Sequence, residues 1–304
     1  MGRRKPQLSP LHPRYWPSWI GVVIVWLIGQ LPLPVLLMMG RGLGTLFLHL
    51  AGSRRATAET NIRLCFPELD QQQQQRLARD TINSLGQALC EITASYCNQR
   101  LDLEKHFTFK GLEHVQRAID AGQGVLMIGM HFNTLDIAAR ALALKVPYSS
   151  VYRPNDNPAV EWLISRGRGA HSQHYIRRAD TRLMVKLLRS GEPIWYAPDQ
   201  DYGRKHSVFV PFFGHPAATI TGTSRLARLG KAQVIPVAHY RQPGARYLLE
   251  FGPPLDNFPG SNEEEDAERI NSVIEQAVRI SPEQYLWVHR RFKHQPEGQK
   301  NPYR

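Results

Sequence analysis

Cysteine is scarce in this chain of 304 residues. Its three cysteines, Cys65, Cys90 and Cys97, contain no C-x-x-C pair, and their odd number gives no disulfide framework. A small secreted domain held together by disulfides is therefore excluded. The pattern is typical of a protein that folds in a reducing compartment, so we expect the main domain to face the cytoplasm.

Several catalytic motifs are also missing. The chain has no G-x-S-x-G sequence, and no cysteine lies near a suitable histidine and acid in the sequence, so covalent catalysis is not indicated. The glycines of Gly40-Arg-Gly-Leu-Gly44 lack the preceding strand and the acidic residue of a dinucleotide site. His171 and His174 have no evident third metal ligand. We expect neither a metal nor a cofactor.

Charge is absent from the 26 residues between Tyr15 and Gly40. This length can cross a hydrocarbon core, which needs roughly 20 apolar residues. Pro32 and Pro34 interrupt the run, so it is either a kinked span or a hairpin-like anchor in one leaflet. Three tryptophans add interfacial anchors: Trp16, Trp19 and Trp26. We therefore expect residues 1–40 to form a membrane anchor, and the inner membrane to be its location.

The abundant feature is positive charge. A net charge of +12 and a pI near 9.8 predict an anionic partner, which could be nucleic acid, a phosphorylated lipid, an acidic carrier protein or a bilayer surface. The expected anchor favours lipid over nucleic acid. Among the cations that follow residue 165, Arg177 and Arg178 are the better candidates for binding an anionic headgroup.

The order of expected elements predicts an α/β sandwich with an N-terminal membrane-anchoring helix. Residues 41–110 are mainly helical in pattern, and residues 111–304 alternate short apolar strands with helices. The expected strands are residues 125–130, 149–152, 194–197, 232–238 and 247–251. A helix is expected over 263–280, and another from Ser281, with Pro282 at its first position.

His131 and Asp136 carry the strongest chemical signal. His131 follows the apolar strand that begins at Val125, and Asn133 or Thr134 can cap a helix whose first turn contains Asp136. If the turn brings the carboxylate onto one ring nitrogen, the other nitrogen can take a proton from a substrate hydroxyl. Spacing alone also fits a buried histidine beside a capping aspartate, but the position at a strand's carboxyl end favours a catalytic pair.

Two further loops follow expected strands. Arg153 and Asn155 come after the strand at 149–152, and Asp199 and Asp201 come after the strand at 194–197. Arg153 could hold a phosphate or an acyl carbonyl, whereas Asn155 fits a turn equally well. We expect one of the two aspartates to orient a basic residue, and we place Asp199 among the substrate-binding candidates.

These residues lie in motifs that resemble the late acyltransferases of lipid A biosynthesis, within the wider glycerolipid acyltransferase superfamily. The motifs are His131-x4-Asp136, Tyr152-Arg-Pro-Asn-Asp-Asn-Pro158, Trp195 to Gly203, Ser207 to Gly214, Thr219 to Thr223 and Pro282 to Phe292, with Leu11 to Trp16 and Cys65-Phe-Pro-Glu68 before them. The resemblance runs the whole chain and is greatest to the lauroyl and palmitoleoyl branch.

The resemblance implies transfer of a fatty acyl chain from acyl carrier protein to a hydroxyl on a 3-hydroxyacyl chain of a Kdo-bearing lipid A precursor. We expect a 12-carbon chain, with C16:1 as the alternative. A lysophospholipid or glycerol-phosphate acyltransferase would share His131 and Asp136, and a non-catalytic protein that binds anionic lipid would need only the arginines and the anchor. Both remain alternatives at this stage.

Overall fold

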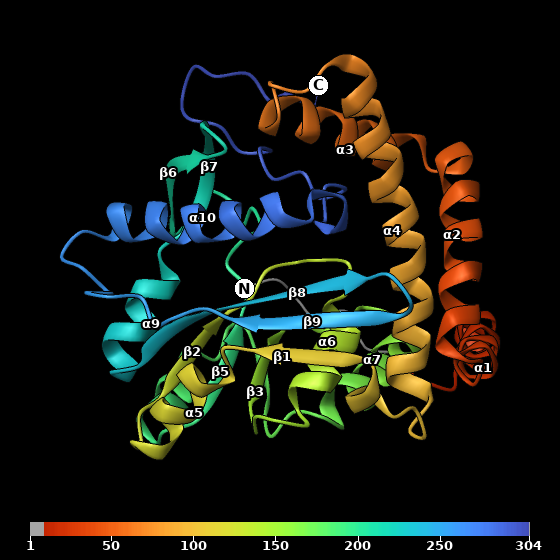
Figure 1. Ribbon diagram of the computed structural model, residues 1–304, viewed down its shortest axis with the longest axis horizontal. Helices are drawn as coiled ribbons and strands as arrows, with labels where there is room; N and C mark the ends of the chain where they lie inside the picture. Colours follow the sequence, from red (N-terminus) through yellow and green to blue (C-terminus); the bar gives the residue numbers. More distant parts are fainter. Residues whose placement is uncertain (1–8, 304) are drawn as a thin grey trace.

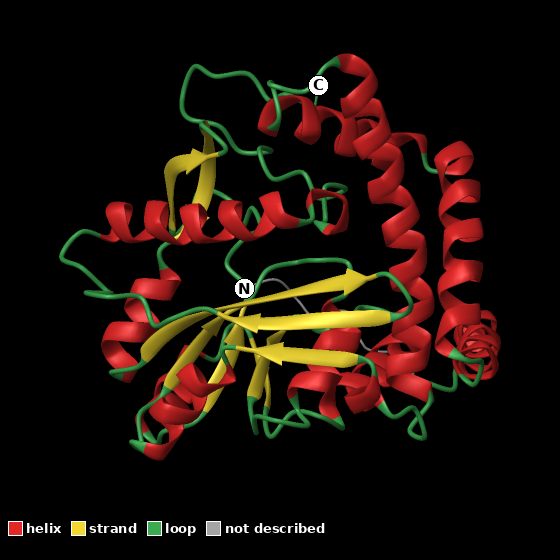
Figure 2. Ribbon diagram, in the orientation of Figure 1, coloured by secondary structure: helices red, strands yellow, loops and turns green. Residues whose placement is uncertain are grey.

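The computed structural model describes residues 9–303 as an α/β sandwich, in which a seven-stranded sheet lies between layers of helices (Figures 1 and 2). This confirms the expected fold class. The strand order is β1-β9-β8-β2-β5-β3-β4, and β6 and β7 form a separate hairpin. The strands are β1 Phe107–Lys110, β2 Val125–Ile128, β3 Ser149–Tyr152, β4 Tyr175–Arg177, β5 Pro193–Tyr196, β6 Ser207–Phe212, β7 His215–Ile220, β8 Gln233–Gln242 and β9 Arg246–Phe251.

Central strand β2 shows why the sheet needs helices on both faces. All four of its residues are buried, and successive side chains point to opposite faces. Leu126 and Ile128 join one apolar core, whereas Val125 and Met127 join the other. The helices that supply these cores and cover the sheet are α3 Gly52–Cys65, α4 Gln71–Cys97, α5 Leu112–Asp120, α6 Leu135–Leu142, α7 Pro158–Gly169, α8 Thr181–Arg189, α9 Gly222–Gly230 and α10 Glu263–Ile280.

The direction of the strands gathers four loops at one edge. β2 pairs in parallel with β5, β5 with β3, and β3 with β4. Their carboxyl ends therefore share an edge, which brings the loops of His131, Arg153 and Asp199 to one rim of the sheet. Such an edge is where open α/β sheets bind ligands.

The prediction of a helix that begins at Ser281 is wrong. Only the 3-10 turn Pro282–Gln284 forms there, and the chain then runs irregularly past the loop that follows β2. Its backbone pairs with that loop instead of with itself, since Leu286 N–H donates to His131 O at 3.0 Å and Asn133 N–H donates to Gln284 O at 2.7 Å. Strands β1, β4, β6 and β7 were also not predicted from the sequence. Strand β1 lies at the end of segment 41–110, so this segment is not entirely helical and its last residues join the sheet.

The charge-free N-terminal run forms two helices, α1 Trp16–Gly29 and α2 Leu33–Leu50, with Pro32 at the bend between them. The axes of the two helices are steeply inclined to each other: in Figure 1, α1 is seen end-on, whereas α2 runs down the page. Within the described residues, α2 alone is long and apolar enough to cross a membrane. It also extends ten residues past the boundary expected at residue 40, while residues 1–8 of the expected anchor lie outside the described part.

Helix α2 packs on α4 through glycines. A Cβ added at Gly86 would lie 2.2 Å from Gly40 O and 2.4 Å from Gly44 N, so the two helix backbones are in direct contact there. Gly42, on the outer side of α2, has no atom within 4 Å of such a Cβ. The close approach fixes the position of α2 against the rest of the fold.

Gly86→Ala should therefore force the two helices apart and lower the free energy of unfolding by about 3 kcal/mol, the upper range for inserting a methyl group into a filled contact. Gly42→Ala is the matched control and should be neutral or slightly stabilising, because alanine favours helix and meets nothing there. Denaturant unfolding in detergent checks both; equal midpoints for the two variants would contradict the close-packing account.

Candidate active site

His131 lies in the loop between β2 and α6, at the carboxyl edge of the sheet. Gly129, the first residue after β2, packs against the indole ring of Trp195. A Cβ at this position would lie 2.3 Å from the ring, so only glycine fits there. The His131 side chain keeps 23% of its surface exposed. The imidazole is thus held at a buried strand end while one side of the ring remains accessible.

The carboxylate that contacts His131 belongs to Asp199, three residues after β5. Its Oδ2 accepts the His131 backbone N–H at 2.7 Å, and its Oδ1 accepts the ring Nδ1–H at 2.5 Å. A carboxylate only accepts, so Nδ1 carries the hydrogen and Nε2 has the free lone pair in the neutral ring. No described residue forms a hydrogen bond with Nε2.

Asp199 is charged although its side chain has no exposed surface. Burial raises the pKa of its carboxyl group, but the nearby His131 ring and the hydrogen bonds from that residue outweigh the burial and lower the pKa to about 2. We expected one aspartate of this loop to orient a basic residue, and Asp199 has that geometry. Its expected contact with substrate is wrong, because both of its oxygens are engaged and enclosed.

Asp136 does not contact His131, which corrects the expected pairing. Its Oδ1 accepts Tyr96 O–H at 2.6 Å and Arg168 Nε–H at 2.6 Å, and its Oδ2 accepts Arg168 Nη2–H at 3.1 Å. The turn does not fold back as assumed, because α6 begins at Leu135 and directs its first-turn carboxylate toward α4 and α7. Burial raises the pKa of Asp136, but the charge and hydrogen bonds of Arg168 and the Tyr96 hydrogen bond together lower it by more, so the carboxyl stays ionised.

The helix that contains Asp136 starts as expected, but its cap differs. Thr134 is the N-cap residue of α6, yet its side chain makes no capping bond. Its hydroxyl instead lies 2.8 Å from Nδ1 of His239, a buried histidine on β8. Burial, and to a smaller extent the nearby His131 ring in its charged form, lower the pKa of His239 to about 4. His239 is therefore neutral, and its ring packs edge to face on Phe132, the residue after His131.

The remaining rim candidates are placed as follows. Arg153 follows β3 and is exposed, as are Arg177 at the end of β4 and Arg178 after it. The Arg178 guanidinium lies 6.0 Å from the ring centre of Tyr202, in the loop that carries Asp199. Asn155 builds the turn before α7, since its Oδ1 accepts Asn157 N–H at 2.9 Å. The turn interpretation thus accounts for Asn155.

The C-terminal segment closes the inner side of the site. Tyr285, Leu286 and His289 line a cavity of about 10 Å³ beside His131 and Asp199. That volume is about enough for one water molecule. Burial lowers the pKa of His289 to about 4, so this histidine is uncharged. A substrate therefore reaches the imidazole from the exposed side of the ring.

A second histidine repeats the same arrangement nearby. Oδ2 of Asp201 accepts the backbone N–H of His294 at 2.9 Å, and Oδ1 lies 2.7 Å from its Nδ1. The carboxylate is as enclosed as that of Asp199, with 1% of its side chain exposed. This pair fastens the C-terminal segment to the loop after β5, and it offers a structural counterpart against which the His131 pair can be compared.

Comparisons with known proteins identify the family of the chain. Residues 3–294 match the sequence family described as bacterial lipid A biosynthesis acyltransferase. The chain belongs to this family. It is 40% identical over 295 residues to the lipid A biosynthesis lauroyltransferase of Escherichia coli K12, with 96% of each chain covered. It is 37% identical to the palmitoleoyltransferase of that organism with the same coverage, and 28% identical over 301 residues to its myristoyltransferase, with 96% of this chain and 92% of the relative covered.

This acyltransferase also has site residues that sequence reasoning did not single out. Tyr96 and Arg168 hold Asp136 from 40 and 32 residues away in sequence, so no local spacing links them. Arg168 stands in a run of cations, and nothing in the sequence separates it from its solvated neighbours. The helical period of α4 and α7 places both residues on inward faces, but only the packing of α6 between them identifies their partner.

Asp136→Asn should destabilise the acyltransferase, because it leaves the Arg168 guanidinium without its anionic partner. Breaking a buried ion pair costs about 3–5 kcal/mol of the free energy of unfolding. We expect a smaller loss of about 2 kcal/mol here, because a third of the Arg168 side chain is exposed to solvent. Denaturant unfolding measures this loss, and Arg168→Gln combined with Asp136→Asn should recover part of it. A single variant as stable as the parent chain would show that the pair contributes nothing.

Proposed function

We propose that the enzyme transfers a fatty acyl chain from acyl carrier protein to a hydroxyl of a 3-hydroxyacyl chain on a Kdo-bearing lipid A precursor, in the late stage of lipid A biosynthesis. The observation that supports this most directly is the His131–Asp199 pair, with Nε2 free on the exposed side of the ring. The lipid A precursor fits the family to which the chain belongs.

His131 acts as the general base. Its Nε2 takes the proton of the acceptor hydroxyl while the hydroxyl oxygen attacks the thioester carbonyl, since an alcohol is too weak a nucleophile without such help. The tetrahedral intermediate then collapses, the C–S bond breaks, and the departing thiolate takes the proton back from Nε2. The products are an ester and a free thiol, and no acyl group is attached to the protein.

Asp199 keeps the base ready for this step. It holds the hydrogen on Nδ1, so the lone pair is on Nε2, and its charge stabilises the imidazolium that forms during attack. Asp136 acts differently, because it touches Arg168 and Tyr96 instead of the ring. We assign it the role of a positioning residue that fixes the start of α6 and thereby the loop that carries His131.

Arg153 is the candidate for binding the oxyanion of the intermediate. Two kinds of donor could serve, Arg153 or the backbone N–H groups after His131. The N–H groups of Phe132 and Asn133 already donate to Met130 O and Gln284 O, at 2.9 and 2.7 Å. Arg153 is exposed on the same rim and has no ion-pair partner in the described part of the chain. Arg177 and Arg178 would then bind phosphate groups of the precursor.

The acyl donor and the membrane complete the proposal. A net charge of +12 suits both an acidic carrier protein and an anionic bilayer surface. We place the enzyme at the inner membrane through α1 and α2, with the sheet domain facing the cytoplasm, where the free cysteines stay reduced. Greater identity to the lauroyl- and palmitoleoyltransferases than to the myristoyltransferase favours a C12 donor, with C16:1 as the alternative.

His131→Ala should lower turnover by at least ~10²-fold while the fold stays intact, because proton transfer by a positioned histidine contributes about that much. Mass spectrometry of the product formed from a tetra-acylated Kdo-linked precursor and a mixture of acyl carrier protein thioesters gives the reaction, the acceptor and the chain length together. A purified variant with near-native rate would remove the mechanism. Acylation of glycerol phosphate in place of the precursor would instead favour the alternative acceptor.

Asp199→Asn should also lower kcat by at least ~10²-fold, with smaller changes in KM, because the amide no longer fixes the tautomer of His131. Asp201→Asn is the matched control: it removes the same kind of clamp from His294 and should leave the rate within about threefold, as expected of a residue outside the proton transfer. If Asp136→Asn abolished turnover at full stability and Asp199→Asn did not, the assignment of roles would be reversed.

A further inference from the structure

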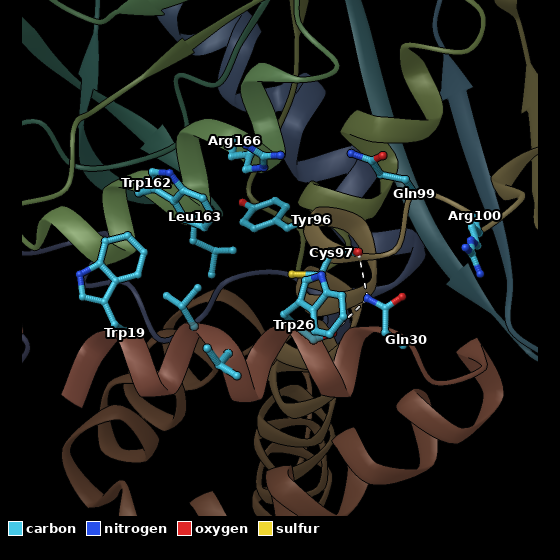
Figure 3. Close-up of a pocket in the computed structure, with 12 residues that line it drawn as sticks. Trp19, Trp26, Gln30, Tyr96, Cys97, Gln99, Arg100, Trp162, Leu163 and Arg166 are labelled. Atoms are coloured by element: carbon cyan, nitrogen blue, oxygen red, sulfur yellow. Dashed lines mark hydrogen bonds between the residues drawn. The ribbon is translucent and has the colours of Figure 1, made fainter. Parts of the chain in front are cut away.

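A cavity of about 790 Å³ opens between α1, the carboxyl end of α4 and α7, outside the site described above (Figure 3). Trp19 and Trp26 form its lower wall on α1, and Trp162 and Leu163 form its upper wall on α7. The rings of Trp19 and Trp162 meet edge to face, 5.4 Å apart between centroids. An elongated apolar ligand fits a space with such walls.

Two polar groups of the cavity wall are already engaged in hydrogen bonds. Gln30 donates from its amide nitrogen to Trp26 O at 3.1 Å and to Cys97 O at 3.0 Å, and Figure 3 draws these bonds across one end of the cavity. The Tyr96 hydroxyl is engaged with Asp136. The Gln30 amide nitrogen and the Tyr96 hydroxyl are therefore not available to an occupant, and the tryptophan and aliphatic walls favour a hydrocarbon chain over a polar ligand.

Helix α1 is apolar on two sides. One stripe faces the cavity with Trp19, Val22, Val23 and Trp26, spaced as one face of a helix. A second stripe consists of exposed residues that do not line it: Trp16, Ile20, Ile24 and Leu27. The outer stripe would lie in the bilayer under the proposed membrane association. The cavity is then next to lipid, and a chain can enter it from the side.

One wall residue connects the cavity to the helix that follows the His131 loop, and positively charged side chains lie at the cavity margin. Tyr96 is in its wall and holds Asp136, so the cavity borders the helix that follows the His131 loop. Arg100 and Arg166 are exposed at its margin, and neither forms an ion pair within residues 9–303. The Arg166 guanidinium lies over the Trp162 ring, 5.5 Å from its centre. A lipid with a phosphorylated headgroup matches apolar walls with free cations at the margin.

We propose that this cavity binds one acyl chain already present on the phosphorylated lipid acceptor, and thereby positions its hydroxyl for His131. The proposal rests on the function proposed above and adds where the acceptor is held. The donor chain is a less suitable occupant, because it arrives on a soluble protein, whereas the cavity opens beside the outer stripe of α1.

Val23→Trp would narrow the cavity, and Ile24→Trp makes a comparable change on the outer stripe of the same helix. With the tetra-acylated precursor as acceptor, Val23→Trp should raise the acceptor KM about tenfold, equivalent to about 1.4 kcal/mol of binding. The KM of the acyl carrier protein thioester and kcat should stay unchanged. Ile24→Trp should behave like the parent enzyme. A parent-like acceptor KM for Val23→Trp, or an increase confined to the donor KM, would overturn the proposal.

A second measurement reports on the cavity even if no acyl transfer to the precursor is found. Phosphatidic acid with a diazirine at the end of one acyl chain should label the peptides that contain residues 19–26 or 162–166 upon irradiation, and Trp162→Ala should reduce labelling without filling the space. Excess precursor should prevent labelling, and acyl carrier protein thioester should not. Labelling outside these segments, or protection by the thioester alone, would contradict the assignment, whereas failure of the proposed function would appear only in the turnover assay.

Discussion

The Asp199 carboxylate binds two N–H groups of one residue, and the reactive geometry depends on this contact. One oxygen holds the backbone of His131 and the other holds its ring, so the imidazole cannot turn without losing a charge-assisted hydrogen bond. Because the carboxylate is enclosed, water does not compete for these bonds. The ring is therefore oriented before any substrate arrives, which suits the general-base role proposed for His131.

The parallel sheet is what makes this contact possible. β2 and β5 are neighbours in register, with Ile128 opposite Tyr196, and the two side chains that meet lie three residues beyond these positions. A partner from the adjacent strand is fixed relative to the histidine by the ladder of backbone bonds. A partner five residues along the same chain would depend on a turn, and here that turn is taken up by the start of α6. The neighbouring strand thus gives the more rigid clamp.

Asp136 explains how a His-x4-Asp spacing can matter although the two side chains do not meet. Its carboxylate joins α4, through Tyr96, to α7, through Arg168, at the first turn of α6. The loop that carries His131 lies between this junction and β5. It is held at one end by an ion pair and at the other by the histidine clamp. Its conformation therefore depends on both carboxylates, but only one of them acts on the ring.

The sequence predicted those parts of the fold and site that depend on short-range patterns along the chain. The apolar run at β2, the amphipathic α10 and the carboxyl-edge position of His131, Arg153 and Asp199 all follow from short-range patterns, as did the prediction that Asp199 or Asp201 orients a basic residue. The choice between Asp136 and Asp199 as partner did not, because it depends on strand order, which brings residues 68 positions apart together. The segment after Ser281 has helix-start signals, but its backbone groups pair with the His131 loop, and that competition is visible only in three dimensions.

The positions of the N-terminal helices α1 and α2 are also set by packing against the rest of the fold. With 14 residues, α1 is roughly 21 Å long at 1.5 Å per residue, too short for a hydrocarbon core of roughly 30 Å. Helix α2 is longer, but contacts of Gly40 and Gly44 with α4 hold one of its sides against the protein. A detached anchor would be free to tilt relative to the domain it carries. Here the apolar surface is part of the fold, so under the proposed membrane association the orientation of α4, and with it Tyr96 and the start of α6, would be set relative to the lipid surface at α1.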